Sequence, residues 1–307
     1  MEIIKITKND EGQRLDSFLK KIMPNSPGGV IYKYIRTNKI KLNSKKPKPD
    51  VRLMEGDEIK YFGDSAFLKT KTFIPAAYTL DVLYEDENIL VVNKPRNMAS
   101  QPDATHKSAT LVDNIKNYLY QKGEYTPESE NSFSPALCNR IDYNTCGICI
   151  AGKNAESLRL LNEKVKSREI RRFYTCVTLG VPKPESGVIK GQILKKAAEN
   201  KSYVVKSGGK DAETHYKVLK TDGKNALCEV EIISGRSHQV RAHMSSIGYP
   251  LCGDFKYGAK EGSGQYLMAN KVLFEFKTDA GILNYLRDKT VEAPHNFDLS
   301  KIKSRND

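Results

Sequence analysis

Strand-like segments dominate the chain after residue 78, and this pattern limits the possible folds more than any other feature. Residues 80–84 and 89–93 flank a polar turn and predict a β-hairpin. Segments rich in apolar residues predict further strands at 173–179, 213–220 and 227–233. Helical spacing occurs mainly at residues 110–120 and after Asn154, so strands and helices do not alternate as in a parallel βαβ fold. We predict an α+β fold with a mixed, mostly antiparallel sheet.

The first 62 residues form a different pattern, in which two short helices are followed by strands. Residues 12–62 contain twelve Lys and Arg against five Asp and Glu. Their net charge of +7 is more than half of the +13 of the whole chain. Such a charge density suits a domain that binds a polyanion, although a solvated basic face gives the same pattern. We predict a small domain at 1–62, a linker at 63–77 and a larger domain at 78–307. The polar segment 123–134 is expected to be a mobile loop.

Composition argues against a membrane or secreted protein. Charged residues make up 28% of the chain, and no apolar run approaches membrane-spanning length. The first residues alternate charged and apolar positions and do not resemble a signal peptide. We therefore expect a cytoplasmic protein that does not contact membranes and whose six cysteines are reduced. A monomer is the default expectation.

A metal centre is not expected either. Cys146 and Cys149 form a single CxxC pattern, but no second pair or nearby histidine supplies the other ligands of a zinc site. The pair continues into an apolar segment, where cysteine acts as a small hydrophobic residue. His238 and His243 are five residues apart, which is not the spacing of zinc ligands on one helical face.

Asp142 is the first residue that could carry chemistry. It precedes a polar turn, and that turn leads into the apolar segment beginning near Ile148. A carboxylate at this point would project from the mouth of a cleft. Aspartates in such turns are more often structural hydrogen-bond acceptors, so the position alone favours a structural role over catalysis.

A second polar cluster lies at residues 235–243, directly after an apolar strand. Its Arg, His, Gln and Ser side chains are dense in hydrogen-bond donors, which suits contacts to phosphates and base edges. Arg241 is able to hold a carboxylate in a bidentate pair. No glycine-rich phosphate loop and no GxSxG pattern point to another chemistry.

These clusters resemble the RluA family of pseudouridine synthases. The family's core motif, His-Arg-Leu-Asp-x-x-Thr-Ser-Gly, corresponds to residues 139–147. Its Gly-Arg-x-His-Gln-x-Arg-x-His motif matches residues 235–243, and the following Gly-x-Pro-x-x-Gly-Asp matches residues 248–254. Val-x-Asn-Lys-Pro matches residues 91–95, and Tyr174 aligns with the family's active-site tyrosine.

The N-terminal segment resembles an S4 RNA-binding domain. The resemblance rests on Arg14-Leu15-Asp16-x-x-Leu19 and on the segments 39–43 and 55–59. An S4-like domain ahead of the synthase motifs is similar to the layout of bacterial members that modify large-subunit ribosomal RNA. The resemblance therefore implies isomerisation of uridines in structured RNA, with 23S ribosomal RNA as the expected partner.

The resemblance also implies the roles of individual residues. Pseudouridine has the same composition as uridine, so no cofactor is needed. Asp142 would be the essential carboxylate, Arg241 would pair with it, and Tyr174 would lie against the uracil and take its C5 proton. Arg140 would fill the base stack that an extruded uridine leaves. The other implied substrate-binding residues are Lys94, Pro95, Arg236, His238 and Gln239.

The chain departs from the family pattern at three positions. Asn139 replaces the usual histidine and Cys146 the usual serine, and both flank the reaction site. Asn97 stands where a glycine often follows Lys-Pro-x in the family, a mild change because asparagine tolerates positive φ.

Three other functions fit parts of the pattern. A transfer-RNA pseudouridine synthase would share the same motifs. A non-catalytic RNA-binding factor for ribosome assembly would explain the basic charge but not the joint presence of Asp142, Tyr174 and Arg241. A thiol enzyme built on Cys146 and His238 would need a thiol of lowered pKa beside a basic group.

Overall fold

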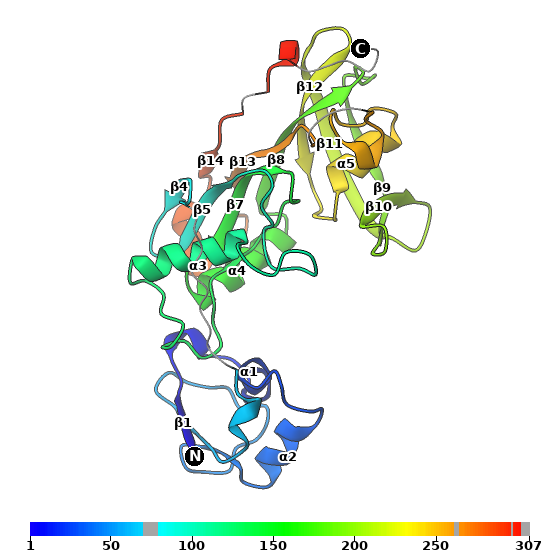
Figure 1. Ribbon diagram of the computed structural model, residues 1–307. Helices are drawn as coiled ribbons and strands as arrows, with labels where there is room; N and C mark the ends of the chain where they lie inside the picture. Colours follow the sequence, from blue (N-terminus) through cyan, green and yellow to red (C-terminus); the bar gives the residue numbers. More distant parts are fainter. Residues whose placement is uncertain (70–78, 261–263, 296, 302–307) are drawn as a thin grey trace.

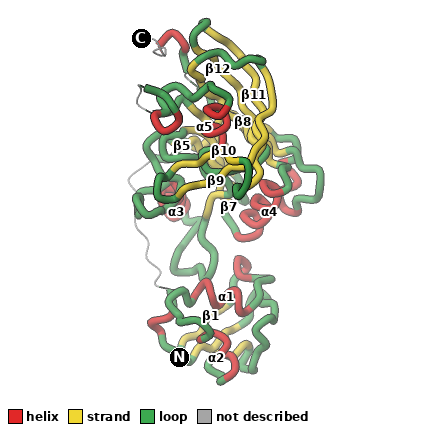
Figure 2. The backbone as a smooth tube through the Cα atoms, turned by 90° about the vertical axis from the view of Figure 1, so that its right-hand side faces the viewer, coloured by secondary structure: helices red, strands yellow, loops and turns green. Residues whose placement is uncertain are grey.

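A computed structural model describes residues 1–69, 79–260, 264–295 and 297–301. The molecule is elongated, with the N-terminal region at one end and the part of the larger region that carries β12 at the other (Figures 1 and 2). Within the described residues, no helix is both long and apolar enough to cross a membrane. Part of the predicted linker, residues 70–77, lies outside the described residues. Its first part contains a 3₁₀ turn, η2, at Ser65–Phe67.

The N-terminal region has its own sheet and its own core. Strands run in the order β1–β3–β2 and are all antiparallel. Leu15, Phe18 and Leu19 lie on one face of α1 and are fully buried, as the helical spacing predicts. Their partners include Ile35 and Ile59. The elements are β1 (Glu2–Lys5), η1 (Lys8–Asp10), α1 (Leu15–Ile22), α2 (Val30–Arg36), β2 (Ile40–Leu42) and β3 (Glu58–Tyr61).

The larger region is built on one extended sheet. Its strand order is β10–β9–β11–β12–β8–β13–β7–β5–β4, with β14 pairing β13 and β6 pairing β7. The strands are β4 (Val82–Glu85), β5 (Ile89–Lys94), β6 (Ala136–Leu137), β7 (Cys146–Gly152), β8 (Ile170–Leu179), β9 (Ser186–Lys196), β10 (Lys201–Val205), β11 (Lys210–Thr221), β12 (Asn225–Ile232), β13 (Leu267–Phe274) and β14 (Thr290–Glu292).

The expected α+β class with a mostly antiparallel mixed sheet is confirmed. Among the strands of the described residues, one neighbouring pair is parallel, where Met268 and Ala269 of β13 lie opposite Cys146 and Gly147 of β7. The predicted hairpin is formed by β4 and β5. The β9–β10 hairpin was not predicted from the sequence.

Helices cover both faces of the sheet. Alternation along β5 sends Leu90 and Val92 to one face and Ile89 and Val91 to the other, and all four are fully buried. Helices α3 (Leu111–Gln121) and α5 (Gln239–Ser246) pack on the first face. The second face is covered by α4 (Ala155–Lys166) and η4 (Gly281–Leu286). The remaining turns are η3 (Phe255–Tyr257) and η5 (Leu299–Lys301).

The segment 123–134, which its polarity predicts to be a mobile loop, makes hydrogen bonds to the N-terminal region. The fully buried carboxylate of Asp10 accepts hydrogen bonds from the Ser132 hydroxyl at 2.6 Å and from the Asn131 amide at 2.7 Å. Asn131 also donates to the carbonyl of Lys5 at 2.7 Å. The polar side chains of the segment are therefore used at a junction between the two regions.

Candidate active site

Asp142 lies in the loop between β6 and β7, and the backbone of this loop is held from several sides. The Ser100 hydroxyl donates to the carbonyl of Ile141 at 2.7 Å, and the N–H of Thr145 donates to the carbonyl of Asp142 at 3.0 Å. Gln265 donates to the buried hydroxyl of Thr145 at 3.1 Å. The carboxylate itself retains 25% side-chain exposure. The loop thus presents a partly accessible carboxylate on a rigid backbone.

Lys94 is the last residue of β5, and its side chain contacts the backbone of the same loop. Its ammonium group is buried and donates to the carbonyls of Pro95, Met98 and Tyr143 at 2.8, 2.8 and 3.2 Å. Burial lowers the pKa of Lys94 to about 8, so the group is still mostly charged at neutral pH. All three donors of Lys94, one of the predicted substrate-binding residues, are used on backbone carbonyls. Lys94 positions the residue that follows Asp142.

The replacements at Asn139 and Cys146 have local structural explanations. The Asn139 amide donates to the carbonyl of Ile148 at 3.0 Å, and its oxygen accepts from the N–H of Ile150 at 2.8 Å, so it continues the pairing of β7. The Cys146 thiol points to the carbonyl of Leu267 at 3.8 Å. Asn97 has φ of 58°, the positive value that the family's glycine would allow.

Arg241, on α5, joins two carboxylates. Its Nη1 donates to Asp142 at 2.9 Å, while Nε and Nη2 donate to the two oxygens of Asp254 at 2.6 and 2.9 Å. The expected contact between Arg241 and Asp142 is present, but the bidentate pair is made with Asp254. Burial lowers the pKa of Arg241, and the two carboxylates outweigh this and raise it above its ordinary value. Arg241 therefore stays charged beside Asp142.

His238 and Tyr257 lie next to Arg241 and Asp142 and contact each other. His238 Nε2 lies 3.8 Å from the Asp142 carboxylate, and its Nδ1 lies 3.0 Å from the Tyr257 hydroxyl. Burial lowers the pKa of His238 below its ordinary value, so the ring is neutral at neutral pH. The guanidinium carbon of Arg241 lies 4.9 Å from the centre of the Tyr257 ring.

Tyr174 lies on β8 in the middle of the sheet, opposite Val230 and Ala269. Its side chain is buried in the layer that also contains Val240 and Met244 of α5. Burial raises the pKa of Tyr174 to about 12, and the Asp142 carboxylate adds to the rise. At neutral pH the phenol is thus protonated, and it lies within the range of the charge of Asp142.

The other predicted substrate-binding residues differ in their burial. Gln239 is buried, and its amide donates to the carbonyl of Glu213 and to Thr214, both at 2.9 Å, so it braces the start of α5. Arg236 is exposed, and its Nε donates to the carbonyl of Asp211 at 2.9 Å. Arg140 is exposed in the same loop as Asp142, and Pro95 is half-buried.

Sequence reasoning missed Asp254 and Tyr257 as site residues. Asp254 was visible as the last residue of the Gly-x-Pro-x-x-Gly-Asp motif, but nothing in that motif indicated its arginine partner. Tyr257 carried no signal of its own. Among the described residues, no group of three or more His, Cys, Asp or Glu side chains is arranged to hold a metal ion.

A partly exposed carboxylate, held by a buried arginine beside a buried tyrosine on an antiparallel sheet, defines a site for chemistry on a polar substrate. A sequence model of the RNA pseudouridylate synthase family matches residues 88–246. An uncharacterized RNA pseudouridine synthase from Mycoplasma capricolum is 33% identical over 297 residues, covering 93% of this chain and 95% of the relative. The chain therefore belongs to the RNA pseudouridylate synthase family, of the RluA type, and is an isomerase.

A second relative agrees with this assignment. Ribosomal large subunit pseudouridine synthase C from Buchnera aphidicola is 30% identical over 276 residues, covering 87% of this chain and 84% of the relative. The structure of human RNA pseudouridylate synthase domain containing 4 has a TM-score of 0.55 and 20% identity, covering 69% of this chain and 87% of the human chain. The human structure shares the fold.

Proposed function

We propose that this enzyme converts specific uridines of large-subunit ribosomal RNA to pseudouridine, with Asp142 as the essential carboxylate. The proposal is carried by the position of the Arg241 side chain. Its Nη1 contacts the Asp142 carboxylate at 2.9 Å, while its Nε and Nη2 are held by Asp254. A guanidinium in this position makes a charge-assisted hydrogen bond to the carboxylate and limits its rotamers. The ribosomal target is supported by relatives such as the Buchnera enzyme, whose name gives the large ribosomal subunit.

The reaction makes few demands beyond such a carboxylate. The bond between N1 of uracil and C1′ of ribose breaks, the uracil turns, and C5 bonds to C1′ while its proton leaves and N1 gains one. Asp142 supplies negative charge, or a nucleophilic oxygen, to the reacting nucleotide. The rigid loop around it favours a single orientation of the reacting groups.

Tyr174 supports the reaction by packing. A phenol with a pKa near 12 is a poor proton acceptor at neutral pH, so the C5 proton transfer expected from the resemblance is disfavoured. Its buried ring instead provides a flat apolar surface against which the detached uracil can turn. Another acceptor, such as water or Asp142 itself, takes the C5 proton.

The N-terminal region serves, we propose, as an S4-like domain that holds the RNA. Lys33, Arg36 and Lys39 are exposed around the end of α2, and Lys45 and Lys46 are exposed on the next turn. Basic side chains of this kind contact phosphates and fix the position of an RNA without reading its sequence.

Tritium release from RNA labelled at uracil C5 tests the role of Asp142. The purified enzyme should release tritium from large-subunit ribosomal RNA, and Asp142→Asn should lower the rate at least ~10³-fold, because the amide keeps the shape and removes the charge. Glu163→Gln, at an exposed position of α4, is the matched control and should not change the rate. Near wild-type release by Asp142→Asn would disprove the mechanism.

Chemical mapping of pseudouridines identifies the substrate. RNA from cells with and without the gene should differ at large-subunit ribosomal positions. A difference confined to transfer RNA would replace the proposed substrate class. No difference in either RNA, together with no tritium release, would favour a binding role without catalysis.

A further inference from the structure

A groove lies beside the active site, between the edge strand β10, helix α5 and the turn η3. Its volume is about 500 Å³, which is in the range of small-ligand sites. The lining side chains that matter here are Lys201, Tyr203, Ser246, Phe255, Lys256 and Tyr257. In Figure 1, α5 lies against the sheet near β9 and β10, at the end of the molecule opposite the N-terminal region.

One aromatic ring separates this groove from the catalytic centre. Tyr257 lines the groove, and its hydroxyl lies 3.0 Å from Nδ1 of His238, whose other nitrogen faces Asp142. The same hydroxyl accepts from the N–H of Ser202 at 2.8 Å and donates to its carbonyl at 3.0 Å, so it closes the free edge of β10. A molecule in the groove would therefore be an immediate neighbour of one bound at Asp142.

The lining combines positive charge with exposed aromatic surface. Lys201 and Lys256 are the charged side chains among the lining residues, and no carboxylate is present among them. The Lys201 ammonium lies 5.2 Å from the centre of the Tyr203 ring and 5.1 Å from that of Tyr257. Phe255 is 57% exposed, although burial of its ring would be favourable. Cations beside open aromatic faces are the combination that binds single-stranded nucleic acids.

We propose that this groove binds a nucleotide next to the target uridine, with its phosphate between Lys201 and Lys256 and its base against Phe255. The inference rests on the proposed function, since it assumes that RNA is bound at Asp142. Extrusion of the target uridine unstacks its neighbours, and a stacking surface beside the active site compensates for part of that cost. The groove would thus hold the RNA in its opened form.

Kinetics of the full-length enzyme test the stacking contact. Phe255→Leu should raise KM for tritium release roughly tenfold, because stacking on an aromatic ring contributes strongly to binding. The effect on kcat should be less than twofold. Phe255→Tyr keeps the aromatic face and should have a KM near that of the wild type. If the contact were only apolar, the KM of Phe255→Leu would be closer to that of the wild type than the KM of Phe255→Tyr.

The salt dependence of binding tests the phosphate contact. Loss of both ammonium groups in a Lys201→Ala/Lys256→Ala double variant should lower the slope of log affinity against log salt by about 0.7, the value for one phosphate contact in a single strand. Lys166→Ala, at the end of α4 on the other face of the sheet, is the control and should leave the slope unchanged. Urea unfolding midpoints within error of the wild type would show that each variant is folded.

The outcomes separate this inference from the proposed function. A wild-type enzyme that releases tritium, together with unchanged KM and salt slope in the groove variants, would overturn the nucleotide site and leave the function intact. If the wild type released no tritium, binding of a labelled twelve-nucleotide single-stranded RNA would still decide the point. Equal affinity of the wild type and the double variant for that RNA would overturn it.

Discussion

At the scale of single residues, the catalytic geometry depends on one arginine with two acidic partners. Arg241 is bound by Asp254 on its Nε side, and only Nη1 is directed to Asp142. The Asp254 side chain is 2% exposed, and its carboxylate accepts from the guanidinium that also contacts Asp142. Asp254 is thus a positioning residue that sets where the arginine meets the essential carboxylate.

Asp254→Asn should therefore impair turnover more than binding. The amide keeps the volume but loses one charge and one hydrogen-bond acceptor, so Arg241 is free to tilt toward Asp142. We expect kcat to fall about 10²-fold, as for a misplacement of about 1 Å, with KM changed less than threefold. Unfolding in urea should also show a loss of about 2 kcal/mol, because the buried guanidinium keeps Asp142 but loses the second of its two carboxylate partners. A kcat within twofold of the wild type would refute the positioning role.

Gly147 shows why the core motif ends in glycine. Its φ is +114°, and a Cβ placed there would lie 2.1 Å from the backbone oxygen of Ala269 on β13. The parallel contact between β7 and β13 passes through this point. No side chain is compatible with it.

Gly147→Ala should destabilise the protein by about 3 kcal/mol. This loss is the sum of two costs: the positive φ of a residue with a Cβ, and the clash of that Cβ with the backbone of Ala269. Gly223→Ala is the matched control, because Gly223 has φ of +86° and no atom lies within 4 Å of the point that its Cβ would occupy. That change should cost only about 1 kcal/mol. Urea unfolding measures both, and equal losses would show that the clash with Ala269 is relieved at no cost.

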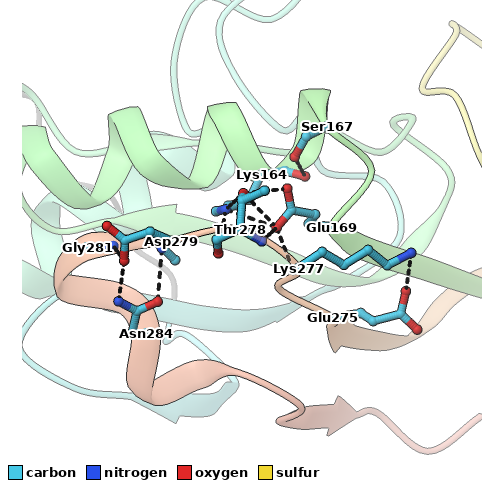
Figure 3. A network of polar contacts seen from close by, with 10 residues as sticks. Lys164, Ser167, Glu169, Glu275, Lys277, Thr278, Asp279, Gly281 and Asn284 are labelled. Atoms are coloured by element: carbon cyan, nitrogen blue, oxygen red, sulfur yellow. Dashed lines mark hydrogen bonds and ion pairs between the residues drawn. The ribbon is translucent and has the colours of Figure 1, made fainter.

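At the scale of elements, a buried polar network joins α4 to β8 and to the chain after β13. Figure 3 shows Lys164 at its centre, near Glu169 and Thr278. The Lys164 ammonium lies 2.9 Å from Glu169, which also accepts from the backbone N–H groups of Lys277 and Thr278 at 2.8 and 3.0 Å. Both charged groups are almost fully buried. These contacts fix the second helical layer behind the sheet that carries the site.

Glu169→Gln should lower stability by about 3 kcal/mol at neutral pH, since Lys164 would be left buried without its partner. Burial raises the pKa of Glu169, but the N–H of Thr278 and the Lys164 ammonium outweigh this and hold it far below its ordinary 4.5. The stabilisation is thus fully present above about pH 5 and declines as pH falls below about 4.5. The difference between wild type and variant in urea unfolding should shrink accordingly. A constant difference down to about pH 3 would contradict the assignment, and Glu163→Gln serves as the exposed control on the same helix.

The elements differ in how well the sequence predicts them. Helix α4 was predictable because Asn154 caps it, accepting from the N–H of Ser157 at 2.8 Å, and because its apolar residues recur at helical spacing. The β9–β10 hairpin was not, since Ile189 and Ile193 are the only buried hydrophobic residues of β9. A strand with so few buried residues does not show a clear alternation of apolar and polar positions in its sequence. Asp142 was found through its motif, whereas Asp254 becomes meaningful only when folding brings it to Arg241.

At the scale of the whole molecule, the basic N-terminal region and the synthase region have separate cores joined through polar contacts. Asp10 links them through Asn131 and Ser132, and Asn9 accepts from the N–H of Ala155 at 2.9 Å at the start of α4. The buried hydrophobic cluster of the first region shares no residue with those around the large sheet. Removal of the first region should therefore leave the catalytic core folded while exposing the polar segment near residue 131.

Deletion of residues 1–62 should weaken binding of structured RNA much more than turnover of a short oligonucleotide. Residues 12–62 contribute +7 to the net charge, so their loss removes phosphate contacts and lowers the salt slope of binding. The short substrate reaches Asp142 without needing those contacts. Filter binding of ribosomal RNA fragments and tritium release from the oligonucleotide measure the two effects.

A full-length Lys45→Glu/Lys46→Glu variant, which keeps the junction, should show a smaller loss of the same kind. Equal losses of binding and turnover on deletion would mean that the N-terminal region forms part of the active site.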